Sequence, residues 1–168
     1  MFECELIVQF LPAETNVILR EPITFIDAKG EWWPVPADFK TDCASVPRFA
    51  WVAFPPFAGL YIKAAVVHDH YCVTRDRSWR SVHRMFYEAM LTAGVESHRA
   101  KTMYAAVYAF GPRRSLDGGD RSISNISATD QVLSSQQLEQ WINDTNPSVE
   151  EIDLYVNKNR IRQVPVVK

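Results

Sequence analysis

The residues best suited to chemistry lie between positions 42 and 83 of this 168-residue chain. They are two carboxylates and two imidazoles within a largely apolar stretch: Asp42, His68, Asp69 and His83. Carboxylate and imidazole groups act as metal ligands and as general acids or bases. The stretch therefore predicts a polar cluster with either a chemical or a structural role.

Two chemical interpretations fit these residue types. In the first, His68 and His83 bind zinc or another divalent metal. A carboxylate from Asp42 or Asp69 is then the third ligand, and an open position remains for a substrate or water. In the second, Asp42 or Asp69 orients His68, which removes a proton from water as a general base. The catalytic candidates are therefore Asp42, His68 and Asp69, and the metal-binding candidates are His68, His83 and Asp42.

A third interpretation is structural. Asp42 would cap a helix or pair with Arg48, and His68 would bond a buried backbone carbonyl. None of the spacings matches a specific signature such as HExxH or a pair of CxxC motifs. The residues alone leave the three interpretations open, and with them the question of whether the chain is an enzyme.

Three predicted helices carry or neighbour these residues. Apolar residues recur at helical spacing from about Ala58, again after Ser78, and a third time from Glu96 to the Gly111-Pro112 pair. His68 and Asp69 are adjacent on the first helix, so their side chains diverge by about 100°. Each of the two therefore needs a partner from another element.

The first forty residues have the character of short strands. The strand-like runs are residues 5–11, 16–19, 23–26 and 31–35. They are separated by proline or by the turn-forming Asp27-Ala28-Lys29-Gly30 sequence, and residues 41–48 are expected to form a loop. This order predicts an α+β fold, with a small antiparallel β-meander packed by about three helices.

After Pro112 the composition changes to Ser, Asp, Gly and Arg, which is typical of a linker. Beyond it we expect two short helices, at 131–143 and 148–156, and a final strand. The chain is therefore divided into a body, residues 1–112, and an extended C-terminal arm, residues 113–168. The arm has too few apolar residues for a core of its own, so it must dock on the body or on another chain. We expect the body to fold without the arm.

The overall composition excludes several classes of protein. The net charge of −2 provides no strong field for binding nucleic acid. No apolar run approaches the roughly 20 residues that cross a bilayer, and the N-terminus lacks the pattern of a signal peptide. The three cysteines show no CxxC spacing, which favours a reducing compartment without disulfides.

Two motifs resemble a known family: FKTDCASVPR at residues 39–48 and AAVVHDHY at residues 64–71. They are similar to the DUF1353 family of bacteriophage and prophage proteins, as are the segments at 86–90 and 103–107. The resemblance covers about residues 1–112 and excludes the arm. One difference is His83, which stands where the family usually has Asp. The resemblance implies a phage origin and supplies no reaction.

We therefore expect a structural or accessory protein of the phage virion, in the tail or the head–tail region. Its partners would be other phage structural proteins or copies of itself, bound by the arm and by an aromatic segment at residues 49–57. It would be made in the cytoplasm of the bacterial host. The alternative is a metal-dependent or His/Asp hydrolase acting on cell-envelope or ester-type substrates, with zinc or another divalent metal as a possible cofactor.

Overall fold

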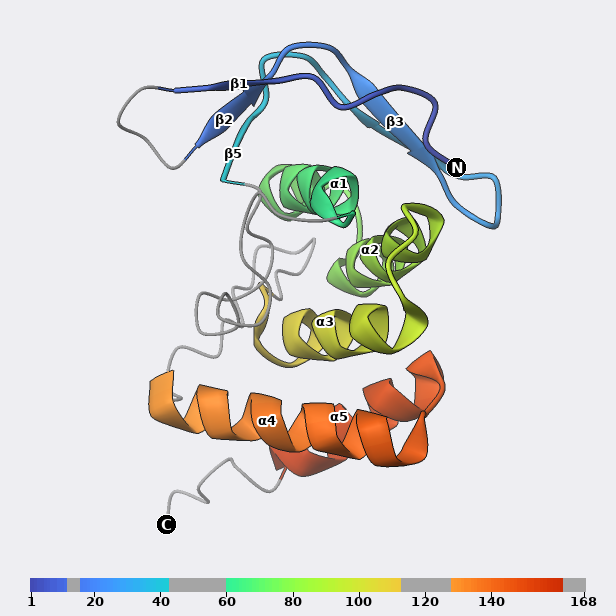
Figure 1. Cartoon of the computed structure of the whole chain (residues 1–168), viewed down its shortest axis with the longest axis vertical. Coiled ribbons are helices and arrows are strands. Elements are labelled where there is room, and N and C mark those ends of the chain that lie inside the picture. Colours follow the sequence, from blue (N-terminus) through green and yellow to red (C-terminus); the bar gives the residue numbers. More distant parts are fainter. Residues whose placement is uncertain (12–15, 43–59, 113–127, 162–168) are drawn as a thin grey trace.

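The computed structural model describes residues 1–11, 16–42, 60–112 and 128–161, which form an α+β fold (Figure 1). The strands are β1 (Val8–Phe10), β2 (Val17–Leu19), β3 (Ile23–Ile26), β4 (Trp32–Val35) and β5 (Lys40–Thr41). The helices are α1 (Ile62–Thr74), α2 (Trp79–Thr92), α3 (Ser97–Phe110), α4 (Ala128–Thr145) and α5 (Val149–Ile161). The predicted fold class is confirmed.

The strands form two small antiparallel sheets, one with the order β1-β2-β5 and one in which β3 pairs with β4. Alternate residues of β2, β3 and β4 are buried, as the period of two in strands requires. The four predicted strand segments are all present: β3 has the predicted bounds, and β1, β2 and β4 are shorter than predicted. β5 corrects the loop expected to begin at Thr41, because Thr41 pairs with Val17 of β2.

The elements are stacked in layers, with the strands at one end and α4 and α5 at the other (Figure 1). A first core fills the space between the strands and α1, α2 and α3. Its largest fully buried side chains are Leu19, Ile23, Phe25, Trp33, Met85, Phe86, Met90 and Met103. Burial of a large apolar side chain stabilises the fold by roughly 1.5–3 kcal/mol, so this cluster is what holds α1 and α2 in position.

Capping residues determine where the helices begin. The Ser78 hydroxyl accepts a hydrogen bond from the Ser81 N–H at 3.1 Å, so Ser78 is the N-cap of α2. Glu96 caps α3 by accepting from the backbone N–H groups of the first turn. Gly94, with a φ of 90°, adopts the left-handed conformation needed between α2 and α3.

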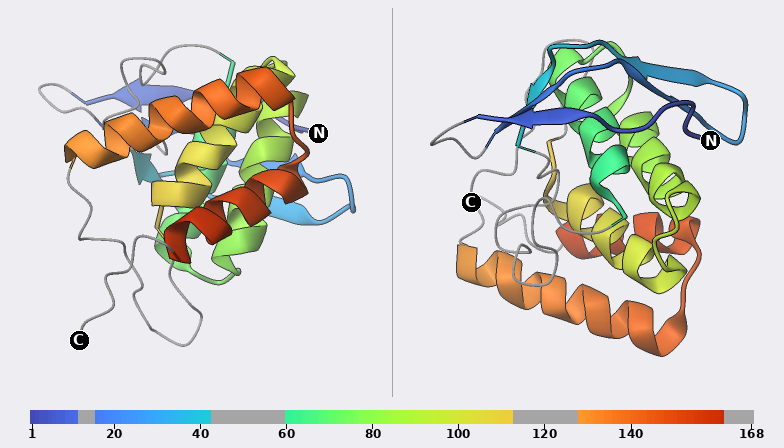
Figure 2. Two further views of the ribbon diagram at one scale, coloured as in Figure 1. Left: turned by 90° about the horizontal axis from the view of Figure 1, so that it is seen from below. Right: turned by 45° about the horizontal axis from the view of Figure 1, so that its top comes forward.

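The helix α3 lies between two cores. Met103 and Val107 face the first core, whereas Tyr104 and Tyr108 face a second core against α4 and α5. The second core is completed by the buried residues Leu138, Ile142, Val149, Ile152 and Val156. Seen from below, α4 and α5 lie across α3 (Figure 2, left). The described part of the predicted arm therefore docks on its own chain.

Both predicted C-terminal helices are present, and both are longer than expected. A capping box begins α5: the Ser148 hydroxyl accepts a hydrogen bond from the Glu151 N–H, and the Glu151 carboxylate accepts one from the Ser148 N–H. The predicted loop beyond Asp42, the aromatic segment 49–57, most of the linker and the final strand fall outside the described residues. Among the described helices, none is both long and apolar enough to span a membrane.

Candidate functional site

The two histidines of the predicted cluster contact each other directly across the α1–α2 interface. His68 Nε2 lies 2.8 Å from His83 Nδ1, a hydrogen-bonding distance, and the rings stack with centroids 5.0 Å apart. Only 1% of His68 and 0% of His83 is exposed. One ring donates and the other accepts, so one of these two nitrogens carries the proton, and each ring provides one hydrogen-bonding partner for the other inside the core.

The pair is enclosed by aromatic side chains. The Phe86 ring lies 4.7 Å from that of His68, and the Trp79 ring lies 5.6 Å from that of His83. Burial in these surroundings penalises the charged form and lowers the pKa of His68 to about 3. His68 is therefore neutral at the pH of a cell.

Cys72 of α1 also contacts His68, although it was not among the site residues predicted from the sequence. Its sulfur lies 3.8 Å from Nδ1 and 3.6 Å from Nε2 of His68. The two nearly equal distances place the sulfur beside the ring, where it is not directed at one nitrogen. The spacing of four residues on one helix was the available signal, because such residues lie on the same face.

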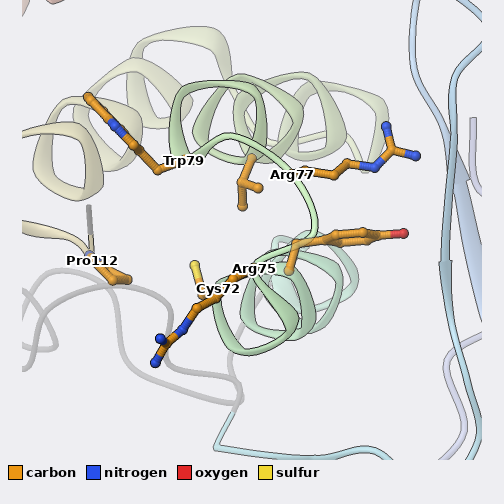
Figure 3. Close-up of a pocket in the computed structure, with 7 residues that line it drawn as sticks. Cys72, Arg75, Arg77, Trp79 and Pro112 are labelled. Atoms are coloured by element: carbon orange, nitrogen blue, oxygen red, sulfur yellow. The ribbon is translucent and has the colours of Figure 1, made fainter. Parts of the chain in front are cut away.

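Figure 3 shows a small pocket between α1 and α2 into which Cys72 projects, close to Trp79 and Pro112. Its volume is about 10 Å³, which leaves room for about one water molecule and none for an organic substrate. The guanidinium groups of Arg75 and Arg77 point away from each other in this view. Among the described residues that line the pocket, these two arginines therefore do not form a pair of cations that would clamp an anion.

Arg77 has a structural role at the edge of this pocket. It donates to the Glu31 carboxylate at 3.1 Å and to the Trp32 carbonyl at 2.9 Å. Its guanidinium also lies 4.2 Å from the centre of the Trp33 ring. These contacts hold β4 against the turn that joins α1 to α2.

Asp69 connects α1 to the sheet. Its Oδ2 accepts a hydrogen bond from the Thr41 hydroxyl of β5 at 2.5 Å. Its other oxygen lies 4.0 Å from His68 Nδ1, which is beyond hydrogen-bonding distance. Asp69 and His68 thus neighbour each other without forming the predicted orienting bond. Asp42 directly follows Thr41, so it begins in the same region, and its convergence on His68 stays a prediction.

A zinc ion does not fit between the two histidines as they are placed. Two nitrogens on a tetrahedral zinc, each about 2.0–2.1 Å from the metal, would lie about 3.3 Å apart. The nitrogens of His68 and His83 are 2.8 Å apart and hydrogen-bonded. Within the described residues, no three His, Cys, Asp or Glu side chains are grouped so as to hold a metal ion.

Comparison with known proteins places these residues within a family. The family model described as "Protein of unknown function (DUF1353)" matches residues 17–107. Two similar proteins come from Sinorhizobium fredii: "Uncharacterized protein y4iH" is 42% identical over 104 residues, and "Uncharacterized protein y4jT" is 39% identical over 112 residues.

The matched regions cover 59% and 65% of this chain, but 42% and 33% of the two relatives. The chain therefore corresponds to less than half the length of either protein. No solved structure matches the chain.

Proposed function

The chain belongs to the DUF1353 family, and from this premise we propose that it is a structural or accessory protein of a bacteriophage virion. It acts by binding neighbouring subunits in the tail or the head–tail region, after synthesis in the host cytoplasm. The observation that carries the proposal is the buried hydrogen bond between His68 and His83 at 2.8 Å. The groups that could do chemistry are used to join α1 to α2.

A catalytic role for His68 is poorly supported by its environment. A general base must reach its substrate and works best with a pKa near the working pH. His68 is 1% exposed, its pKa is lowered to about 3 by burial, and its Nε2 is bonded to His83. Asp69 is likewise committed to Thr41 of β5.

A binding role is supported by large apolar side chains that remain exposed. The exposed fractions are 66% for Phe10, 57% for Trp32 and 70% for Leu154. Scattered apolar residues are common on protein surfaces, but aromatic residues are enriched where proteins bind each other. The resemblance of the two sequence motifs to phage and prophage proteins supports the choice of partner, namely other phage structural proteins or further copies of this chain.

The proposal is tested by mass spectrometry of phage particles that are produced from a genome encoding the chain and purified by repeated density-gradient banding. We expect the chain to remain in the particle band at a constant ratio to the major structural proteins. Purified chain added to particles from a genome lacking its gene controls for adsorption. Loss of the chain from the particles on banding would contradict the proposal.

The hydrolase alternative is favoured by one specific observation, the 4.0 Å approach of the Asp69 carboxylate to His68. A small rotation of the Asp69 side chain would bring the two groups within hydrogen-bonding distance. Purified chain should then cleave ester or cell-envelope substrates, with or without added zinc. A His68→Leu variant is the matched control, and equal rates for both proteins would exclude this alternative.

A further inference from the structure

The outer face of α5 carries an apolar centre between two opposite charges. Glu151, Leu154, Tyr155 and Lys158 follow the spacing i, i+3, i+4 and i+7, which places them on one face of a helix. Leu154 is 70% exposed, and both charged residues are exposed. The opposite face of α5, with Ile152 and Val156, is buried in the second core.

A groove lies beside this face, between α4 and α5. Its volume is about 420 Å³, and its apolar lining is provided by Trp141, Pro147, Leu154 and Tyr155, so the α5 face forms one wall of the groove. The rings of Trp141 and Tyr155 stack with centroids 4.1 Å apart, so the aromatic lining is held in a fixed position. A leucine side chain from a second molecule could enter this groove.

The arrangement of charged and apolar residues on this face of α5 is complementary to a second copy of itself. If two copies of α5 pack antiparallel around a two-fold axis near positions 154 and 155, Glu151 of each copy faces Lys158 of the other. The same operation brings Leu154 against Tyr155 of the other copy, at the edge of its groove. An interface with two-fold symmetry requires such self-complementarity, because each surface patch binds its own equivalent.

We propose that this α5 face, together with the groove formed by Trp141, Pro147 and Tyr155, is a self-association surface whose partner is a second copy of this chain. The biological meaning of this dimer rests on the proposed function, since it would join two copies within the virion. Charge complementarity at positions 151 and 158 selects a second copy over a partner of different sequence. In Figure 2 (left), α5 lies on the side of the molecule nearest the viewer, with α3 behind it.

The proposal is tested first with single substitutions in the full chain, measured by sedimentation velocity over a range of concentrations. We expect the wild-type chain to dimerise and Leu154→Asp to raise the dissociation constant at least tenfold. Val73→Asp is the matched control, because Val73 is also exposed, at 65%, but lies on α1. A monomeric wild-type chain, or equal effects of the two substitutions, would overturn the proposal.

Charge reversal gives a sharper test. Lys158→Glu makes both ends of the face negative, and Glu151→Lys makes both ends positive, so each variant alone should be mainly monomeric. An equimolar mixture of the two should form heterodimers, since every contact across the axis again pairs opposite charges. Glu151→Lys also removes part of the helix cap, so its circular dichroism is checked. Recovery in the mixture supports the antiparallel arrangement, and folded variants that stay monomeric when mixed overturn it.

The tests of the α5 interface and of the virion role can fail independently. A chain that stays in the particle band but never self-associates would overturn the α5 interface and leave the virion role intact. A chain that dimerises through α5 but is absent from particles would support the interface and overturn the virion role.

Discussion

The hydrogen bond between His68 and His83 joins α1 to α2 inside the first core. Each ring is almost completely buried, and each provides the hydrogen-bonding partner that water would otherwise supply. Removing one ring leaves the other with a polar nitrogen in an apolar environment. Removing both leaves an interface that apolar side chains can fill.

This reasoning predicts strong coupling between the two histidines in a double-mutant cycle. We expect His68→Leu and His83→Leu each to lower the free energy of unfolding by about 1–3 kcal/mol, since each leaves a buried nitrogen without its bond. The double variant should lose less than the sum, with a coupling energy of about 0.5–3 kcal/mol. Urea unfolding measures all four proteins, and additive losses would show that the rings do not depend on each other.

Burial of His68 also predicts a dependence of stability on pH. Its pKa in the folded chain, about 3, lies below the ordinary value of 6.5, so the unfolded chain takes up the proton first as the pH falls. The stabilisation is complete above about pH 6.5 and is lost progressively towards pH 3. Between pH 7.5 and pH 5 the loss should be about 2 kcal/mol.

The double variant His68→Leu/His83→Leu is the control for this measurement. Acidic groups elsewhere contribute to the pH dependence of both proteins, so the difference between their profiles reports on the pair. Identical profiles from pH 7.5 to pH 5 would show that His68 is not held in its neutral form by the fold.

The sequence predicted which residues of the site lie together more successfully than it predicted their bonds. His68 and His83 were both candidates, and the structure brings them into contact. Their direct bond could not be predicted, because it depends on how α1 and α2 cross. The divergence of His68 and Asp69 followed from helix geometry, whereas the bond from Thr41 to Asp69 required knowledge of β5.

At the scale of the elements, a network of charged and hydrogen-bonded side chains joins α5 to α2 and α3. Arg84 of α2 contacts the carboxylates of Glu150 at 2.6 Å and of Asp153 at 2.7 Å. Tyr104 of α3 donates to the second oxygen of Asp153 at 2.5 Å. Burial, together with the nearby Asp153 carboxylate, raises the pKa of Tyr104 and keeps its hydroxyl protonated as a donor.

The network predicts unequal effects for its two carboxylates. Asp153→Asn should lower stability by about 1 kcal/mol, because Asp153 is 23% exposed and is bonded by both Arg84 and Tyr104. Glu150→Gln is the matched control and should have a smaller effect, because Glu150 is 70% exposed and solvent screens its charge. Urea unfolding, combined with hydrogen exchange of the α5 amides, measures the loss of stability in each variant. Equal losses in the two variants would contradict the prediction that Asp153 contributes more than Glu150.

Local signals in the sequence identified most elements, and contacts between distant residues account for what was missed. Ser78, Glu96 and the Gly111-Pro112 pair marked the helix ends. The pair Lys40 and Thr41 is too short and too polar to indicate a strand, and it is defined by pairing with β2. The docking of α5 through Arg84 and Asp153, 69 positions apart, left no local pattern.

At the scale of the whole molecule, the second core changes the expectation for a chain without its arm. The sequence predicts that residues 1–112 fold alone, and the division into body and arm stays a prediction. The helices α4 and α5 cover Tyr104 and Tyr108, which are 0% and 1% exposed. Their removal would expose an aromatic face of α3 to water, which costs free energy and promotes association.

We therefore expect deletion of residues 115–168 to give a helical body that aggregates and unfolds at lower temperature than the full chain. Introducing Tyr104→Ser and Tyr108→Ser into the truncated chain should restore a monomer, because the newly exposed face becomes polar. Size-exclusion chromatography and circular dichroism compare the three proteins. A truncated chain as soluble and as stable as the full chain would show that α4 and α5 lie outside the cooperative core.

The central claim is that the buried histidines hold the fold and that the chain acts by binding other subunits. The most direct measurement is the infectivity of phage whose genome encodes the His68→Leu/His83→Leu chain, at a temperature where the purified variant is folded. Particle incorporation of the variant is measured alongside. The account predicts normal incorporation and infectivity within a few-fold of wild type. A folded, fully incorporated variant whose particles lose infectivity would contradict it, because the histidines would then be required for more than the fold.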